Sequence, residues 1–292
     1  QNESLVEIAT FLARRWSERG NVTVEFSDKI QTKTRLKENR IILTSMEKRI
    51  GDDFQKYRQF RISLWFEAMR IKFCKKIFSD DHAFGFILNT METRRVEQLG
   101  RKLWKGMDEE IIYNYAYMFL ARPQLHTIYG KARIVEAFYQ YFMFGTFKDE
   151  IQSSHFERIK KATEFAKKIV DESIGKKYDT EWLEKKVSEI IKILDVDSLL
   201  TIPISLPFMK VGMPISEEEL LKFLTIISKN KEGDFGKIDS KAVLKGDNVY
   251  DEYKVLLDEN RKNNKKGLSQ ESIGIHIPLT TNVDETVIYD MN

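Results

Sequence analysis

The sequence has 292 residues, of which 42% are hydrophobic and 12% aromatic, enough to bury a large globular core. Its 48 Lys and Arg against 45 Asp and Glu leave a formal net charge of +3, so the overall balance does not indicate a nucleic-acid-binding polycation. The single cysteine, Cys74, excludes an internal disulfide and a multi-thiolate metal site within one chain.

The first fifty residues predict one helix and a small antiparallel β element. Apolar residues recur at helical spacing over 4–19 and stop at Gly20. Residues 22–26, 32–36 and 40–43 alternate polar with apolar side chains or carry β-branched ones, which is typical of strands.

Most of the chain that follows predicts helices. They are expected at 53–78, 81–103, 108–121, 127–147, 149–174 and 179–195. Residues 201–214 space prolines between apolar residues, which indicates an extended strap, and Ser216 opens a short helix to about residue 229. Residues 230–272 are rich in Lys, Asn, Asp and Gly and predict a polar linker with a turn or two of helix near 250–258.

We therefore expect a mainly α fold in three parts. A helical core with an N-terminal β-hairpin covers 1–215, a short helix and polar linker cover 216–272, and a strand-like segment covers 273–292. The sequence has no basic-then-apolar N-terminal signal and no run of about 18 uncharged apolar residues, so we expect a cytoplasmic protein with no membrane partner. Its heavy use of Lys, Glu and Ile is typical of thermophile proteins.

The helix expected at 53–78 carries a polar stripe. Apolar side chains cover most of its middle, which indicates a helix inside a core. When the basic residues towards its ends are set aside (Arg58, Arg61, Lys72, Lys75 and Lys76), the remaining polar residues are Gln59, Ser63, Glu67 and Arg70. These residues are spaced four, four and three apart, so they share one face of the helix.

Part of this stripe resembles the helix of a zinc peptidase. The stretch 63–73 (SLWFEAMRIKF) would contain H-E-x-x-H, a motif with two zinc-ligating histidines, if residues 66 and 70 were histidines. Phe66 and Arg70 stand at those positions, on either side of Glu67. Neither side chain can ligate zinc.

The next helix places a carboxylate on its apolar face. That face is defined by Leu88, Val96, Leu99 and Leu103. Glu92 falls near its centre, whereas Arg94 and Glu97 are expected to point away. A lone buried carboxylate costs several kcal/mol or takes up a proton, so Glu92 needs a partner, and the candidates are Arg70 and Arg95.

Two segments carry a resemblance to a known family. Residues 88–106 (LNTMETRRVEQLGRKLWKG) look like the ALE-x-x-RVE-x-LG…G segment of VWA proteins of the cobaltochelatase CobT and nitric-oxide-reductase NorD type. Residues 277–287 (IPLTTNVDETV) are similar to the Y-x-x-YT-x-x-FDE-x-V stretch that precedes the VWA domain of that family. The family's D-x-S-x-S motif is not in the sequence, so the resemblance implies a VWA domain beyond Asn292 or one that has been lost.

The order of elements also resembles a minimal gluzincin-type metallopeptidase: a β-hairpin, a helix at the H-E-x-x-H position and a second helix with a glutamate. Carried over residue by residue, the resemblance places Glu67 at the general base and Glu92 at the third ligand, with Phe66 and Arg70 at the histidine positions. It implies a degenerate, inactive site without metal or cofactor. We expect Arg70 to place its guanidinium where the cation would sit and to pair with Glu67 or Glu92.

The function that the resemblance implies is a non-catalytic adaptor. It would work with a MoxR-family AAA+ ATPase that remodels a client complex or inserts metal into it. One alternative is a metal-dependent hydrolase of the gluzincin type that uses Glu67 and Glu92 with unrecognised ligands. A second is a helical nucleic-acid-binding protein, favoured only if the basic residues share one face; we expect no nucleic-acid partner.

Plainer interpretations of the same residues stay open. Glu67 and Arg70 also fit an ordinary i,i+3 pair on a helix surface, and Glu92 also fits a core glutamate satisfied by an arginine. The four histidines are scattered and have no i,i+4 partner. The aromatic residues within 113–119 and 138–144 fit a core better than a base-stacking surface.

Overall fold

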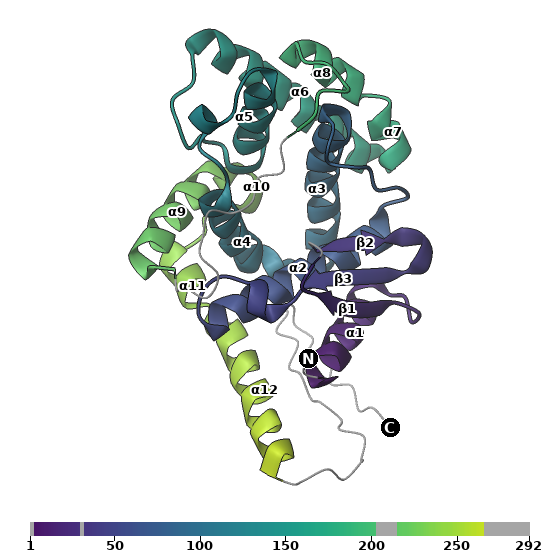
Figure 1. Cartoon of the computed structure of the whole chain (residues 1–292), viewed down its shortest axis with the longest axis vertical. Helices are drawn as coiled ribbons and strands as arrows, with labels where there is room; N and C mark the ends of the chain where they lie inside the picture. The colour runs from purple at the N-terminus through teal and green to yellow at the C-terminus, as the bar shows by residue number, and fades with distance from the viewer. Residues whose placement is uncertain (1–2, 30–31, 203–214, 266–292) are drawn as a thin grey trace.

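Helices dominate the fold, which confirms the predicted fold class (Figure 1). The computed structural model describes residues 3–29, 32–202 and 215–265. The helices are α1 (Glu3–Ser17), α2 (Asp53–Phe73), α3 (Ala83–Leu103), α4 (Asp108–Ala121), α5 (Lys131–Phe144), α6 (Ser153–Lys176), α7 (Thr180–Glu184), α8 (Val187–Leu194), α9 (Glu217–Asn230), α10 (Glu232–Phe235), α11 (Ser240–Lys245) and α12 (Asp247–Lys265).

A small sheet lies near the N-terminus, where the sequence predicts the β element. Strands β1 (Thr23–Ser27), β2 (Lys33–Arg35) and β3 (Arg40–Thr44) are ordered β1-β3-β2. β2 and β3 pair antiparallel across a tight turn, but β1 pairs parallel with β3, so the sheet is mixed rather than wholly antiparallel. The apolar run 41–43 is buried, which makes β3 the central strand. The chain reverses between β2 and β3, so β3 runs in the same direction as β1.

Helix α2 runs through the centre of the molecule (Figure 1). It packs against α1, α3, α4 and α12 and against strands β2 and β3. Its start is fixed by a capping box, in which Asp52 accepts from the backbone N–H of Gln55 and the Gln55 side chain accepts from that of Asp52. Trp65 and Phe60 are fully buried, as the apolar surface of this helix predicts.

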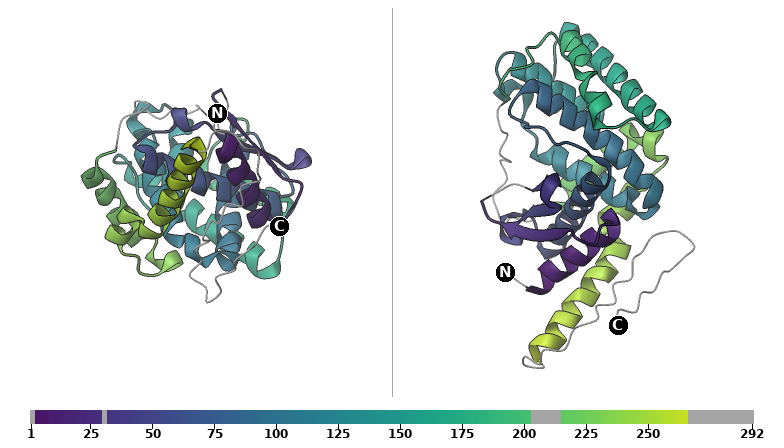
Figure 2. Two further views of the ribbon diagram at one scale, coloured as in Figure 1. Left: turned by 90° about the horizontal axis from the view of Figure 1, so that it is seen from below. Right: turned by 90° about the vertical axis from the view of Figure 1, so that its right-hand side faces the viewer.

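Helices α10 to α12 replace much of the polar linker that the composition of 230–272 predicts. Asp239 caps α11 with its side chain, and Val243 and Leu256 are buried against the rest of the protein. Glu252 of α12 accepts hydrogen bonds from the buried Arg61 Nε of α2 at 3.1 and 3.2 Å. A few anchoring contacts therefore hold a segment whose overall composition is polar. Figure 2 shows α12 beside α1, and residues of both helices line a shared pocket.

Two other predicted features fall largely on parts of the chain that the structure does not describe. The predicted strap is described only at residues 201 and 202, where Thr201 forms an isolated antiparallel bridge with His82. The remainder of the strap and the strand-like segment 273–292 lie outside the described residues. Among the helices that are described, none is long and apolar enough to cross a membrane.

Candidate functional site

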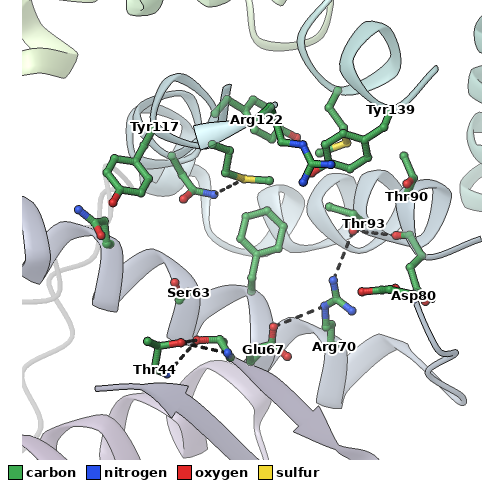
Figure 3. Close-up of a pocket in the computed structure, with 18 of the residues that line it drawn as sticks. Thr44, Ser63, Glu67, Arg70, Asp80, Thr90, Thr93, Tyr117, Arg122 and Tyr139 are labelled. Carbon is green, nitrogen blue, oxygen red and sulfur yellow. Dashed lines mark hydrogen bonds and ion pairs between the residues drawn. The ribbon is translucent and has the colours of Figure 1, made fainter. Parts of the chain in front are cut away.

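The polar stripe of α2 forms one wall of a pocket of about 500 Å³ (Figure 3). Its four residues, Gln59, Ser63, Glu67 and Arg70, all line this pocket. Side chains of α3, α4 and α5 form the facing walls, and residues from the sheet and the turn before α2 close one side. The side-chain spacing seen in the sequence thus corresponds to a real cavity wall.

Three of the four residues singled out in the sequence come together here: Phe66, Glu67 and Arg70. Arg70 Nε lies 3.7 Å from Glu67 Oε1, and Arg70 Nη2 donates to Thr93 Oγ1 of α3 at 3.4 Å. Glu67 also accepts a hydrogen bond from the hydroxyl of Thr34 in β2. Arg70 therefore forms an ion pair with Glu67, one of its two expected partners.

A second carboxylate stands close to the Arg70 guanidinium. Asp80 lies beside Arg70 at this end of the pocket and accepts a hydrogen bond from the Asn89 side chain (Figure 3). Burial opposes the charge on Arg70, but Glu67 and, to a lesser extent, Cys74, Asp80 and Glu92 act in the other direction, and the pKa of Arg70 lies above its ordinary value. This part of the wall carries a fixed positive charge between two carboxylates.

Glu92, the fourth candidate, does not line the pocket. It is buried, and Arg95 of the same helix donates to both its oxygens, through Nε to Oε1 and through Nη2 to Oε2 at 3.1 Å. Thr180 Oγ1 donates to Glu92 Oε2 at 2.8 Å, and Cys74 Sγ lies 3.1 Å from the same oxygen. Of the two expected partners, Arg95 is the one that binds Glu92. Glu67 and Glu92 therefore do not converge on one site.

Other residues of the segment 88–106 also have structural roles. Contrary to the sequence prediction, Arg94 and Glu97 do not point into solvent, because α3 is packed by other helices on several sides. Arg94 forms an ion pair with Asp234 at 2.7 Å, and the Tyr115 hydroxyl donates to Glu97. Burial raises the pKa of Glu97 to about 7, although nearby cations oppose the shift.

Other charged groups in the pocket wall were not among the residues singled out in the sequence. Arg122 follows α4; its Nε donates to Glu136 Oε1 at 2.9 Å and its guanidinium lies 4.5 Å from the centre of the Tyr139 ring. Arg49 precedes α2 in an irregular segment and is almost fully buried in the wall. Tyr117 also lines the pocket, and burial raises its pKa to about 12.

The described residues contain no cluster of three or more His, Cys, Asp or Glu side chains arranged to hold a metal ion. The site is instead a polar cavity with aromatic and thioether side chains among its lining, in which two arginines, Arg70 and Arg122, have carboxylate partners. Such a cavity has the size and mixed lining of a small-molecule or peptide site. No protein-family model, curated protein or solved structure matches the chain.

Proposed function

We propose that this chain is a non-catalytic binding domain, an adaptor that works with a MoxR-family AAA+ ATPase on a client complex. The observation that carries the proposal is the Glu67–Arg70 ion pair in the pocket wall. In the zinc-peptidase helix that this stretch resembles, these two positions hold the general base and the second histidine ligand.

The chemistry of the pair supports binding rather than turnover. A guanidinium has five N–H donors and no lone pair to offer a metal, and it keeps its proton at any physiological pH. The carboxylate of Glu67 is engaged by Arg70 and by the Thr34 hydroxyl, whereas a general base needs a free oxygen directed at its substrate. The partnership with the ATPase rests on the resemblance of residues 88–106 and is therefore the part to test first.

A reconstitution tests the adaptor proposal. The purified chain is mixed with the MoxR-family ATPase of the same genome in ATP, in ADP and without nucleotide, and the complex is measured by size-exclusion chromatography with light scattering. We expect co-elution that depends on the nucleotide and a changed rate of ATP hydrolysis. Failure to co-elute in all three states at micromolar concentration contradicts the proposal.

A metal analysis tests the absence of catalysis. The wild-type chain and the Glu67→Gln variant are purified without chelator or affinity nickel, and metal per chain is measured by mass spectrometry, with peptide hydrolysis assayed in added Zn²⁺. Glu38→Gln, a change at a half-exposed glutamate of the sheet region, is the matched control. We expect the same low metal content and no hydrolysis in all three. Stoichiometric zinc with hydrolysis that only Glu67→Gln loses would favour the hydrolase instead.

A further inference from the structure

The side chain of Arg49 is buried in the pocket wall and has no carboxylate partner among the residues that the structure describes. It is only 7% exposed, and its one hydrogen bond is a long one, from Nη1 to Ser63 Oγ at 3.4 Å. Its Nε and Nη2 are buried and have no hydrogen-bond partner. Consistent with this, burial lowers the pKa of Arg49 to about 10. A buried charged donor left unpaired is costly, so a partner for this edge is expected to come from outside the fold.

Other arginines of this protein show what that edge binds. Nε and Nη2 lie on the same side of a guanidinium and together match the two oxygens of a carboxylate. The pairs that use this edge on a single carboxylate include Arg58 with Glu110, Arg95 with Glu92, Arg101 with Asp108 and Arg122 with Glu136. In Arg49 the same two atoms are covered by the protein, and no carboxylate of the described residues pairs with them.

The Arg49 end of the pocket lies away from Asp80. Arg49 donates to Ser63 at this end, and Figure 3 shows Tyr117 on the side of Ser63. Glu67 lies one helical turn beyond Ser63 and is engaged by Arg70 and Thr34. Asp80 stands at the other end with Arg70, seven residues further along α2 than Ser63, or about 10 Å at the rise of an α-helix. The Arg49 end is therefore positive and rich in hydroxyl groups.

We propose that this pocket binds an organic monocarboxylate, whose charged group pairs with the guanidinium of Arg49 and whose apolar body lies among the aromatic side chains. Phe66, Met118 and Tyr139 supply apolar lining beyond the charged end. A single unpaired guanidinium matches one negative charge; a phosphate dianion would call for a second free cation, and Arg70 and Arg122 already have partners. This inference goes beyond the adaptor proposal and does not depend on the ATPase.

Matched ligands test the proposal by isothermal titration calorimetry. The probes are monocarboxylates of increasing size from acetate to 4-phenylbutyrate, each compared with its neutral amide, and 2-phenylethyl phosphate. An N-acetylated Ala-Ala-Phe peptide with a free or an amidated C-terminus distinguishes a peptide end from a free acid as the source of the carboxylate. We expect the larger acids to bind at least tenfold more tightly than their amides and more tightly than the phosphate.

Variants of the arginine complete the test. Arg49→Met should abolish the preference for acid over amide, and Arg49→Lys, which keeps the charge but loses the two-donor edge, should retain only part of it. Arg35→Gln, at an exposed arginine of β2, should change nothing. Because none of the described carboxylates pairs with Arg49, Arg49→Met should melt at the same temperature as the wild type or higher.

Three results would overturn the proposal. The first is equal binding of acids and amides, or no binding of either, by the wild type. The second is an acid preference that survives in Arg49→Met. The third is an Arg49→Met variant that fails to fold while Arg49→Lys folds and binds acids no better than amides, since Arg49 would then serve the structure alone. Tighter binding of 2-phenylethyl phosphate than of the acids would refute the carboxylate as the ligand group.

Discussion

Replacing Gly100 by alanine tests whether a glycine is needed at this position of the segment 88–106 for α3 to pack against α2. Gly100 lies in α3 where that helix meets α2, and a Cβ atom built there would come within 2.7 Å of Trp65 Cζ2 and 3.0 Å of Met69 Cγ. Both neighbours are fully buried. A methionine side chain can shift, but the indole ring of Trp65 is held on all sides, so the strain falls on the contact between the helices.

The magnitude follows from two opposing effects. Alanine in a helix is favoured over glycine by about 0.5–1 kcal/mol when nothing obstructs it. Overpacking a close-packed core costs about 1–3 kcal/mol. Gly100→Ala should therefore lower the free energy of unfolding by about 0–2.5 kcal/mol, with a central value of about 1 kcal/mol. In Gly175→Ala, near the end of α6, the new Cβ meets no atom within 4 Å, so this variant should be as stable as the wild type or up to about 1 kcal/mol more stable.

Urea unfolding followed by circular dichroism measures both changes, provided that the slope with denaturant stays constant. Combining Gly100→Ala with Trp65→Phe should cost less than the sum of the single changes, because the smaller ring vacates the space that the new methyl group needs. A Gly100→Ala variant that gains as much stability as Gly175→Ala would refute the argument that the two helices touch at this position.

Two further predictions concern buried carboxylates of α3. Glu92→Gln should lower the free energy of unfolding by about 3 kcal/mol, because it removes the charged partner of the buried Arg95. The control Glu38→Gln should change the free energy of unfolding by less than about 0.5 kcal/mol. Equal urea midpoints for the two variants would contradict this prediction. Burial raises the pKa of Glu97 to about 7, so the folded chain keeps a proton that the unfolded chain loses near pH 4.5. The contribution of Glu97 to the free energy of unfolding should therefore fall as the pH rises from about 4.5 to 7. Thermal melts across that range should show a flatter profile for Glu97→Gln, and parallel profiles would mean that Glu97 is already ionised at low pH.

Regular patterns made part of this structure predictable. The stripe on α2 follows from spacing alone, because residues three and four apart share a helix face whatever surrounds the helix. The burial of Glu92 follows from its place among leucines and valine, and its partner Arg95 lies within reach on the same helix. These are local relations, and they need no knowledge of how the helices are arranged.

Relations between distant segments were not predictable in the same way. Arg49 stands in an irregular segment 14 residues before Ser63, and nothing in its neighbourhood indicates that it is buried. The composition of 230–272 predicts a linker, yet the ion pair of Glu252 with Arg61 joins positions 191 residues apart and helps to hold α12 on α2. Arg94 was assigned to the solvent side because one helix face was judged without its neighbours.

The arrangement of charges around Glu67 and Glu92 bears on the role of the buried Arg49. Glu67 and Glu92 each form an ion pair with an arginine three residues further along the same helix, so each helix neutralises its own carboxylate. A shared cation site would require the two carboxylates to turn toward one another, and Glu92 is held away from the pocket by Arg95. With Glu67 engaged by Arg70 in this way, the pocket retains Arg49 as a buried positive charge that no carboxylate of the described residues neutralises. That imbalance favours a cavity whose remaining capacity is for binding an anion from outside rather than for holding a metal within.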